Sequence, residues 1–226
     1  MRARMAFPFD IVGFDMDGTL LDTSGDLAAA VNHALASAGR APLPVARIKT
    51  MIGGGARHML AQGMAATGGC TDAELDVLHR RLLDFYEANM VVETAPYPHA
   101  LAALGQLAAR GAALAIVTNK IERYAVQVLA ALGLSDRFAC VIGGDTLPVG
   151  KPDPAPIRAM VERCGGGTAA FVGDSIYDVR AARAAGLPVI GCSFGFLDRL
   201  AADLGADAVI DGFDELVPTL ERLAAT

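Results

Sequence analysis

Long apolar runs are absent from this 226-residue sequence, and their absence excludes a conventional membrane-spanning helix. Such a helix needs about 20 consecutive apolar residues, whereas the most apolar stretch, 101–117, is interrupted by Gln106 and Arg110. Residues 1–9 carry two arginines, but their apolar run is too short for a signal peptide. We therefore expect a cytoplasmic protein with no membrane partner.

Cysteine is scarce, and its spacing excludes the common zinc and redox motifs. Among the four cysteines there is no C-x-x-C pair, and no histidine lies at metal-ligand spacing from them. Cys140 and Cys192 lie in apolar, strand-like runs, where buried free thiols are common. We expect structural thiols in a reducing compartment, and the same for Cys70 and Cys164.

Positive charge is also in deficit. Lys and Arg number 19 against 25 Asp and Glu, which gives a formal net charge of −6. An acidic chain is by default a poor ligand for nucleic acid, although a local basic patch can evade that rule. The hydrophobic fraction of 53% excludes a disordered chain. We expect a folded monomer or homodimer with no nucleic-acid partner.

Short apolar runs alternate with helical stretches over most of the chain. Glycine follows the last turn of each of the four helical stretches (98–110, 122–132, 154–164 and 177–185), as is typical of helix ends. This alternation predicts an α/β fold with a doubly wound, Rossmann-like parallel sheet that is covered on both faces. The predicted strands are 10–15, 113–118, 139–142, 169–173, 188–192 and 208–210.

Residues 22–96 break this pattern, because they contain no convincing strand. Apolar residues recur there at helical spacing, first at Leu27, Val31, Leu35 and Ala38, then at Leu75, Leu78, Leu82, Phe85 and Met90. We predict a doubly wound core formed by 1–21 and 97–226, interrupted by a helical cap domain, 22–96. Ligands of open α/β sheets bind beyond the carboxyl ends of the strands, and the insertion would lie over that edge.

Carboxylates end the first predicted strand, in the sequence DMDGTL from Asp15. In an extended segment Asp15 and Asp17 point the same way. Together they offer hard oxygen ligands for Mg²⁺, or a nucleophile beside an acid/base. The alternative is a strand that simply ends in turn-forming Asp and Gly.

Polar residues also follow the next two strands of the core. Thr118 and Asn119 offer a hydroxyl and amides suited to a phosphate oxygen, although a capped turn would use the same residues. Lys151 lies between Gly150 and Pro152, so it projects from a stiff turn; the alternative is a solvated lysine.

The fourth strand ends in GDSIYD from Gly173. Asp174 lies at the strand end and Asp178 one helical turn later on the same face, unless Asp174 or Ser175 is merely a helix N-cap. In a parallel sheet all four strand ends converge on one edge. Carboxylates, phosphate donors and one fixed cation would meet there, and a phosphate monoester with Mg²⁺ fits that chemistry.

Four motifs together resemble the haloacid dehalogenase superfamily, in that family's order: DMDGTLLDT from Asp15, IVTNK from Ile116, GKPDP from Gly150 and VGDSIYD from Val172. The insertion is similar to the family's C1-type helical cap. Dehalogenases lack the second aspartate of the first motif, so Asp17 points to phosphoryl chemistry.

A narrower resemblance is to the phosphoglycolate phosphatases. It depends on LLDTSGDL from Leu20, IGGGARHML from Ile52 and GGDTLPVGKPDPAP from Gly143. The sequence departs from their pattern at Ile121, where many have proline, and at 193–196, where a tyrosine-containing turn is more usual.

The superfamily resemblance implies a role for each motif. Asp15 would attack phosphorus and form an aspartyl-phosphate, and Asp17 would be the acid/base. Asp15, the backbone carbonyl of Asp17 and Asp174 would hold Mg²⁺, with Asp178 as an orienting residue behind them. The transferring oxygens would be held by Thr118, Asn119 and Lys151. Lys151 would also pair with Asp15 or Asp174.

Cap residues would set specificity. Arg57, which follows the glycine run 53–55, would bind the substrate's far anionic group; the alternative is a solvated helix face. Lys49 could form a Schiff base only in an apolar pocket, and an exposed face beside Arg47 is favoured instead. The scattered histidines show no pairing.

The expected activity is hydrolysis of a small phosphorylated metabolite, 2-phosphoglycolate, to glycolate and phosphate. The alternatives are a beta-phosphoglucomutase-like phosphosugar mutase or a sugar phosphatase, then a phosphonoacetaldehyde hydrolase or a non-catalytic phospho-binding domain.

Overall fold

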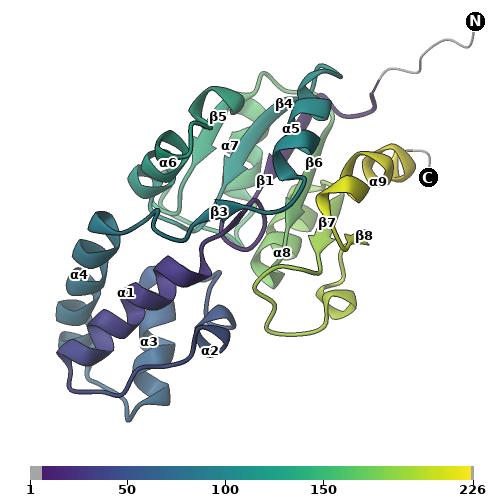
Figure 1. Ribbon diagram of the computed structural model, residues 1–226. Helices are drawn as coiled ribbons and strands as arrows, with labels where there is room; N and C mark the ends of the chain where they lie inside the picture. Colours follow the sequence, from purple (N-terminus) through teal and green to yellow (C-terminus); the bar gives the residue numbers. More distant parts are fainter. Residues whose placement is uncertain (1–6, 225–226) are drawn as a thin grey trace, which may run out of the picture.

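The computed structural model describes residues 7–224. Residues 1–6 and 225–226 lie outside it, and with them part of the segment considered as a signal peptide and the two ends of the predicted core. Within residues 7–224 six parallel strands form one sheet in the order β5-β4-β1-β6-β7-β8 (Figure 1). Every predicted core strand is therefore confirmed: β1 (Ile11–Phe14), β4 (Ala113–Val117), β5 (Cys140–Ile142), β6 (Ala169–Gly173), β7 (Val189–Cys192) and β8 (Ala208–Ile210).

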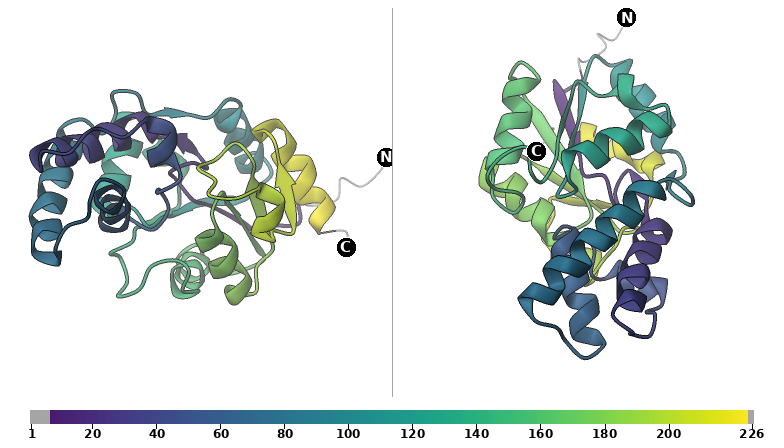
Figure 2. Two further views of the ribbon diagram at one scale, coloured as in Figure 1. Left: turned by 90° about the horizontal axis from the view of Figure 1, so that it is seen from below. Right: turned by 90° about the vertical axis from the view of Figure 1, so that its left-hand side faces the viewer.

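Helices cover both faces of this sheet, as the continuous apolar strands predict. Val12 and Phe14 of β1 belong to the hydrophobic cluster that contains α5 (Ala100–Ala108), α6 (Glu122–Ala131) and α9 (Leu216–Leu223). Ile11, on the opposite face, belongs to the cluster that contains α7 (Ala155–Arg163) and α8 (Ile176–Ala185). Figure 2 shows the sheet edge-on between the two helical layers. The doubly wound fold is thus confirmed, and α9 is an element that the sequence pattern did not reveal.

The helix ends agree with the glycine stops. Gly186 is the C-cap of α8, with φ 81° in the left-handed region that favours glycine. The glycines after α5, α6 and α7 also have positive φ. Three short 3₁₀ turns complete the core: η1 (Ser135–Arg137), η2 (Ala201–Leu204) and η3 (Phe213–Glu215).

Four helices between β1 and β4 have a hydrophobic core of their own. They are α1 (Ser24–Ser37), α2 (Val45–Lys49), α3 (Ala56–Ala66) and α4 (Asp72–Ala88), and they form the helical group at the lower left of Figure 1. Their buried residues form one cluster with Met51, which lies between α2 and α3, and with Tyr124 of the core. This separate core supports our proposal that the insertion is a cap domain, whose limits at 22 and 96 stay a prediction.

Two very short strands join this group to the core. β2 (Leu21–Asp22) pairs antiparallel with β3 (Ala95–Pro96), so the chain enters and leaves the helical group at one place. We expected no strand within 22–96, and this expectation is wrong at both ends, because two-residue strands are too short to show an alternating pattern. No helix in the described chain is long and apolar enough to cross a membrane.

Candidate active site

The first motif forms a tight turn directly after β1. Asp15 is buried, and its Oδ1 accepts a hydrogen bond of 2.7 Å from the Met16 N–H. Gly18 has φ 86°, and its N–H donates to the Leu21 carbonyl at 2.9 Å. A side chain at Gly18 would also run into the Asp174 carboxylate, so the turn packs against the end of β6.

Lys151 is the buried cation of the site. Its side chain is 1% exposed, and its ammonium lies 3.0 Å from Asp15 Oδ1 and 2.6 Å from Asp178 Oδ1. It also donates a hydrogen bond of 2.7 Å to the Val117 carbonyl at the end of β4. The expected pairing with Asp15 is confirmed, and the second carboxylate partner is Asp178 rather than Asp174. The turn at 150–154 thus places a positive charge beside Asp15, the candidate nucleophile.

The two carboxylates after β6 have different surroundings. Asp174 accepts hydrogen bonds of 2.7 Å from the Thr19 hydroxyl and from the Phe196 N–H. Asp178 forms a capping box with Ser175, the N-cap of α8, and Asp178 Oδ2 accepts from the Ser175 N–H at 2.9 Å. Both oxygens of Asp178 therefore have partners. The N-cap of α8 is Ser175 and not Asp174.

Buried negative charge exceeds buried positive charge at this point. Oxygens of Asp15, Asp174 and Asp178 lie within 4.8 Å of one another, and all three residues are buried. Burial raises the pKa of Asp15 to about 7, against the opposing effect of Lys151, and it raises the pKa of Asp174 well above its ordinary value. Burial alone would lower the pKa of Lys151, but Asp15 and Asp178 outweigh it and raise that pKa. One ammonium cannot balance three carboxylates, so the cluster fits an additional bound metal cation.

The end of β4 supplies two further predicted residues. Thr118 is buried, and its hydroxyl accepts from the Lys120 N–H at 3.2 Å. The Asn119 amide donates to the carbonyls of Gly53 and Lys151, at 2.9 Å each, and its oxygen accepts from the Lys151 N–H at 2.9 Å. Asn119 therefore ties the cap segment to the Lys151 turn, and both of its amide hydrogens are already used.

Lys120 is a site residue to which sequence reasoning gave no role. Its side chain is 5% exposed, and its ammonium lies 2.9 Å from Asp17 Oδ2 and 4.7 Å from the centre of the Tyr86 ring. The Asp17 carboxylate also accepts from the Thr23 hydroxyl at 2.8 Å. The motif IVTNK contains this lysine, but a lysine in the turn before a helix carries no sequence signal of burial.

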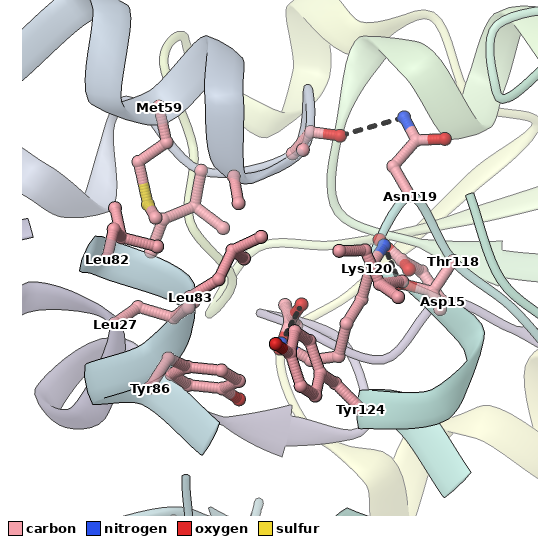
Figure 3. A pocket seen from close by; sticks show the side chains of 16 residues that line it. Asp15, Leu27, Met59, Leu82, Leu83, Tyr86, Thr118, Asn119, Lys120 and Tyr124 are labelled. Carbon is pink, nitrogen blue, oxygen red and sulfur yellow. Dashed lines mark hydrogen bonds and ion pairs between the residues drawn. The ribbon is translucent and has the colours of Figure 1, made fainter. Parts of the chain in front are cut away.

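A pocket opens above these groups, between the core and the helices α1, α3 and α4. Its polar end is formed by Asp15, Asp17, Thr118, Asn119 and Lys120. Its opposite wall is apolar, and Figure 3 shows this wall facing the polar end. The wall residues include Leu27, Met59, Leu82 and Leu83.

The two cap residues singled out from the sequence lie elsewhere. Arg57 is 49% exposed and pairs with Asp76 at 2.9 Å; it is not among the residues described as lining this pocket. A contact between Arg57 and the substrate stays a prediction, and the pairing of Arg57 with Asp76 does not support it. Lys49 is 37% exposed and pairs with Asp22 at 3.6 Å, in agreement with an exposed helix face.

Comparison with known proteins relates this geometry to characterised families. The family model of the haloacid dehalogenase-like hydrolases matches residues 9–186. A phosphoglycolate phosphatase of Agrobacterium fabrum is 40% identical over 229 residues, covering 100% of this chain and 97% of that protein. One of Rhodospirillum rubrum is 43% identical, covering 94% of each. A solved structure, that of a predicted phosphoglycolate phosphatase from Haemophilus somnus, superposes with a TM-score of 0.88 at 30% identity, covering 94% of this chain and 98% of that one.

Proposed function

This chain belongs to the haloacid dehalogenase-like hydrolase family, and from this membership we propose that it is a phosphatase that converts 2-phosphoglycolate to glycolate and phosphate. The relatives named above are phosphoglycolate phosphatases that align over nearly its whole length. The observation that carries the proposal is the position of Asp15, which lines the pocket together with Asp17 and lies 3.0 Å from the Lys151 ammonium. A nucleophile, an acid/base and a fixed cation thus meet at one point.

Asp15 is the proposed nucleophile. Its contacts with the Met16 N–H and the Lys151 ammonium both fall on Oδ1, which orients Oδ2 for attack on phosphorus. Attack gives an aspartyl-phosphate, and water then cleaves this acyl phosphate, so one difficult displacement becomes two easier ones. Lys151 favours the ionised carboxylate that this step requires.

Asp17 is the proposed acid/base. Its carboxyl donates a proton to the departing alkoxide oxygen and later accepts a proton from the attacking water. The Thr23 hydroxyl and the Lys120 ammonium hold this carboxyl at the polar end of the pocket, each through a different oxygen.

A magnesium ion is the proposed cofactor. We assign its ligands to Asp15, the backbone carbonyl of Asp17 and Asp174, because the carboxylate cluster is buried and exceeds its single lysine in charge. When bound, the ion supplies positive charge that lets an anionic nucleophile approach an anionic phosphoryl group. Asp178 acts by orienting Lys151, since its other oxygen serves the helix cap.

Thr118 is the proposed donor to the transferring phosphoryl oxygens, where charge spreads in the transition state. Lys151 supplies positive charge beside these oxygens, because its three N–H groups already meet the Val117 carbonyl, Asp15 and Asp178. Asn119 supports them by fixing the Lys151 backbone, to which it both donates and accepts. A role of Asn119 in contacting phosphate stays a prediction, as do the cytoplasmic location and the monomeric or homodimeric state.

A screen of phosphate monoesters with Mg²⁺, comparing kcat/KM, tests this proposal. We expect 2-phosphoglycolate to rank first with release of free phosphate, and we expect D15N to lose roughly 10³-fold or more in kcat. D136N, at an exposed position in η1, is the matched control and should be unaffected. Turnover retained in D15N would refute the nucleophile.

The screen also separates the other functions. A phosphosugar isomer formed without phosphate would indicate a mutase, and a sugar phosphate ranking first would indicate a sugar phosphatase. Borohydride trapping through Lys49 would indicate a phosphonatase, and the absence of any turnover would indicate a binding domain.

A further inference from the structure

Tyr86 carries an unsatisfied hydroxyl in the pocket. The residue lies in α4, is 3% exposed, and lines the same pocket as Asp15 and Asp17. Within residues 7–224 its hydroxyl has no hydrogen-bond partner. Burial raises the pKa of this hydroxyl against the opposing effect of the neighbouring Lys120, so the group remains a neutral donor. A buried hydroxyl without a partner is costly, which suggests that a ligand supplies one.

Lys120 lies beside this hydroxyl with donor capacity to spare. An ammonium has three N–H donors, and Asp17 is the one carboxylate that pairs with Lys120 in the described chain. The ammonium also packs over the Tyr86 ring, at 4.7 Å from its centre. Figure 3 shows the Tyr86 hydroxyl pointing toward Lys120 and Tyr124. Tyr124 does not compete for a ligand, because its own hydroxyl bonds to Glu87 and Arg123.

We propose that the Lys120 ammonium and the Tyr86 hydroxyl together bind the carboxylate of the leaving group, and that they select phosphate esters whose carboxylate is one methylene away from the ester oxygen. This proposal rests on the proposed phosphatase function and names the groups that recognise its substrate. It also replaces Arg57, whose side chain pairs with Asp76 away from the pocket, as the anion-binding residue.

The spacing follows from the position of Asp17. To transfer its proton, Asp17 must lie within about 2.6–3.2 Å of the ester oxygen. Lys120 lies 2.9 Å from the same carboxyl group. In an O–CH₂–COO⁻ unit, built from bonds of about 1.5 Å, the carboxylate oxygens lie within about 4 Å of the ester oxygen. Asp17 and Lys120 can therefore engage the two ends of one two-carbon leaving group.

The apolar wall explains why longer or hydroxylated leaving groups are disfavoured. Beyond Lys120 and Tyr86 the pocket is lined by Met59, Leu82 and Leu83, which offer no hydrogen bonds. Each additional methylene would carry the carboxylate past Lys120 toward these side chains, and sugar hydroxyls would lose water without gaining a partner. The pocket thus matches a short carboxylated ester.

The test is a selectivity ratio, kcat/KM for 2-phosphoglycolate divided by kcat/KM for ethyl phosphate, measured with Mg²⁺ on one preparation of each variant. Ethyl phosphate has a leaving group of similar length but no carboxylate. We expect a high ratio for the wild type, a fall of about tenfold or more in K120M because a charge-assisted bond is lost, and a fall of about three- to tenfold in Y86F. Because both substrates are measured on the same sample, partial unfolding does not change the ratio.

Matched controls are K49M, at a lysine of the cap, and Y97F, which removes the other buried hydroxyl without a partner in the described chain. Both should leave the ratio unchanged. We also expect 3-phosphonooxypropanoate, which is one methylene longer, to react more slowly in the wild type and to be little affected by K120M. Glycolate, tested as a competitive inhibitor, should bind more weakly to K120M and Y86F.

The outcomes separate this proposal from the proposed function. A wild-type ratio near one, or no hydrolysis of 2-phosphoglycolate, refutes the assigned substrate and the carboxylate site with it. A high wild-type ratio that K120M leaves unchanged refutes the carboxylate site alone, because Lys120 would then act only through Asp17. A ratio lowered by K120M but not by Y86F removes Tyr86 from the site.

Discussion

Replacement of Lys151 by methionine is the sharpest test of the buried charge cluster. K151M keeps most of the volume of the side chain and removes its charge. The side chain is 1% exposed, and its ammonium pairs with Asp15 and Asp178 at 3.0 and 2.6 Å. Without it, Asp15, Asp174 and Asp178 would lie within 4.8 Å of one another with no cation between them.

The expected loss of stability follows from this arrangement. Removing one partner of a buried ion pair costs about 3–5 kcal/mol, because the other charge stays buried without compensation. For a chain of this length the fall in Tm is about 6–20 °C. Protonation of a carboxylate relieves part of the strain, so the loss should be smaller at about pH 5.5 than at about pH 8. Added Mg²⁺ should stabilise K151M more than the wild type, because it supplies the missing charge.

The assay is urea unfolding of metal-free protein at these two pH values, repeated with excess Mg²⁺, together with phosphatase activity. K49M is the matched control: its ion pair is 3.6 Å long and largely solvated, so it should cost at most about 1 kcal/mol. A loss below about 1 kcal/mol in K151M that depends on neither pH nor Mg²⁺ would refute the reasoning, since the carboxylates would then need no cation.

Two more predictions concern other ionisable groups. Burial raises the folded-state pKa of Asp15 to about 7 from 3.8, so the folded protein binds this proton more tightly and metal-free stability should fall by up to about 4 kcal/mol as pH rises from about 4 to about 7. D15N should lack that part of the pH dependence. If the free energy of unfolding changed with pH by the same amount in both proteins, the prediction would be contradicted. The sulfurs of Cys140 and Cys164 are 3.7 Å apart and 24 residues apart in sequence, so excess oxidised glutathione should convert this pair to a disulfide and raise stability by about 3 kcal/mol. Burial raises the pKa of Cys140 to about 12, so exchange should begin at Cys164; thiol titration of the wild type against C164S measures the outcome, and an unchanged thiol count would refute it.

Much of the core was predictable because local chemistry and global topology agree there. Apolar runs gave every strand of the sheet, and parallel pairing then placed the carboxyl ends of β1, β4 and β6 side by side. Asp15 and Asp174 were therefore predictable as neighbours although 159 residues separate them in sequence. Asp178 and Lys151 were predictable as further members of this cluster, because each belongs to a motif that follows a strand of the same sheet.

The cap side of the pocket was not predictable, because it depends on how two separate hydrophobic cores meet. Arg57 follows a glycine run that approaches the site, yet its side chain turns to Asp76 on the neighbouring helix. Tyr86 shares a helical stripe with Leu75, Leu78 and Leu82 and looks like any core residue. Only the packing of α4 over Lys120 distinguishes it from them.

The place of β1 in the sheet has a consequence for how the protein is made. β1 is the first strand of the sheet to leave the ribosome, yet it pairs with β4 and β6, and about 100 residues separate it from β4. At about 5–20 residues per second, roughly 5–20 s of translation pass before the first partner exists. The helices α1–α4 are complete by then and can pack by contacts among themselves. The nascent chain would therefore carry an assembled helical bundle beside a central strand that still lacks both of its neighbours.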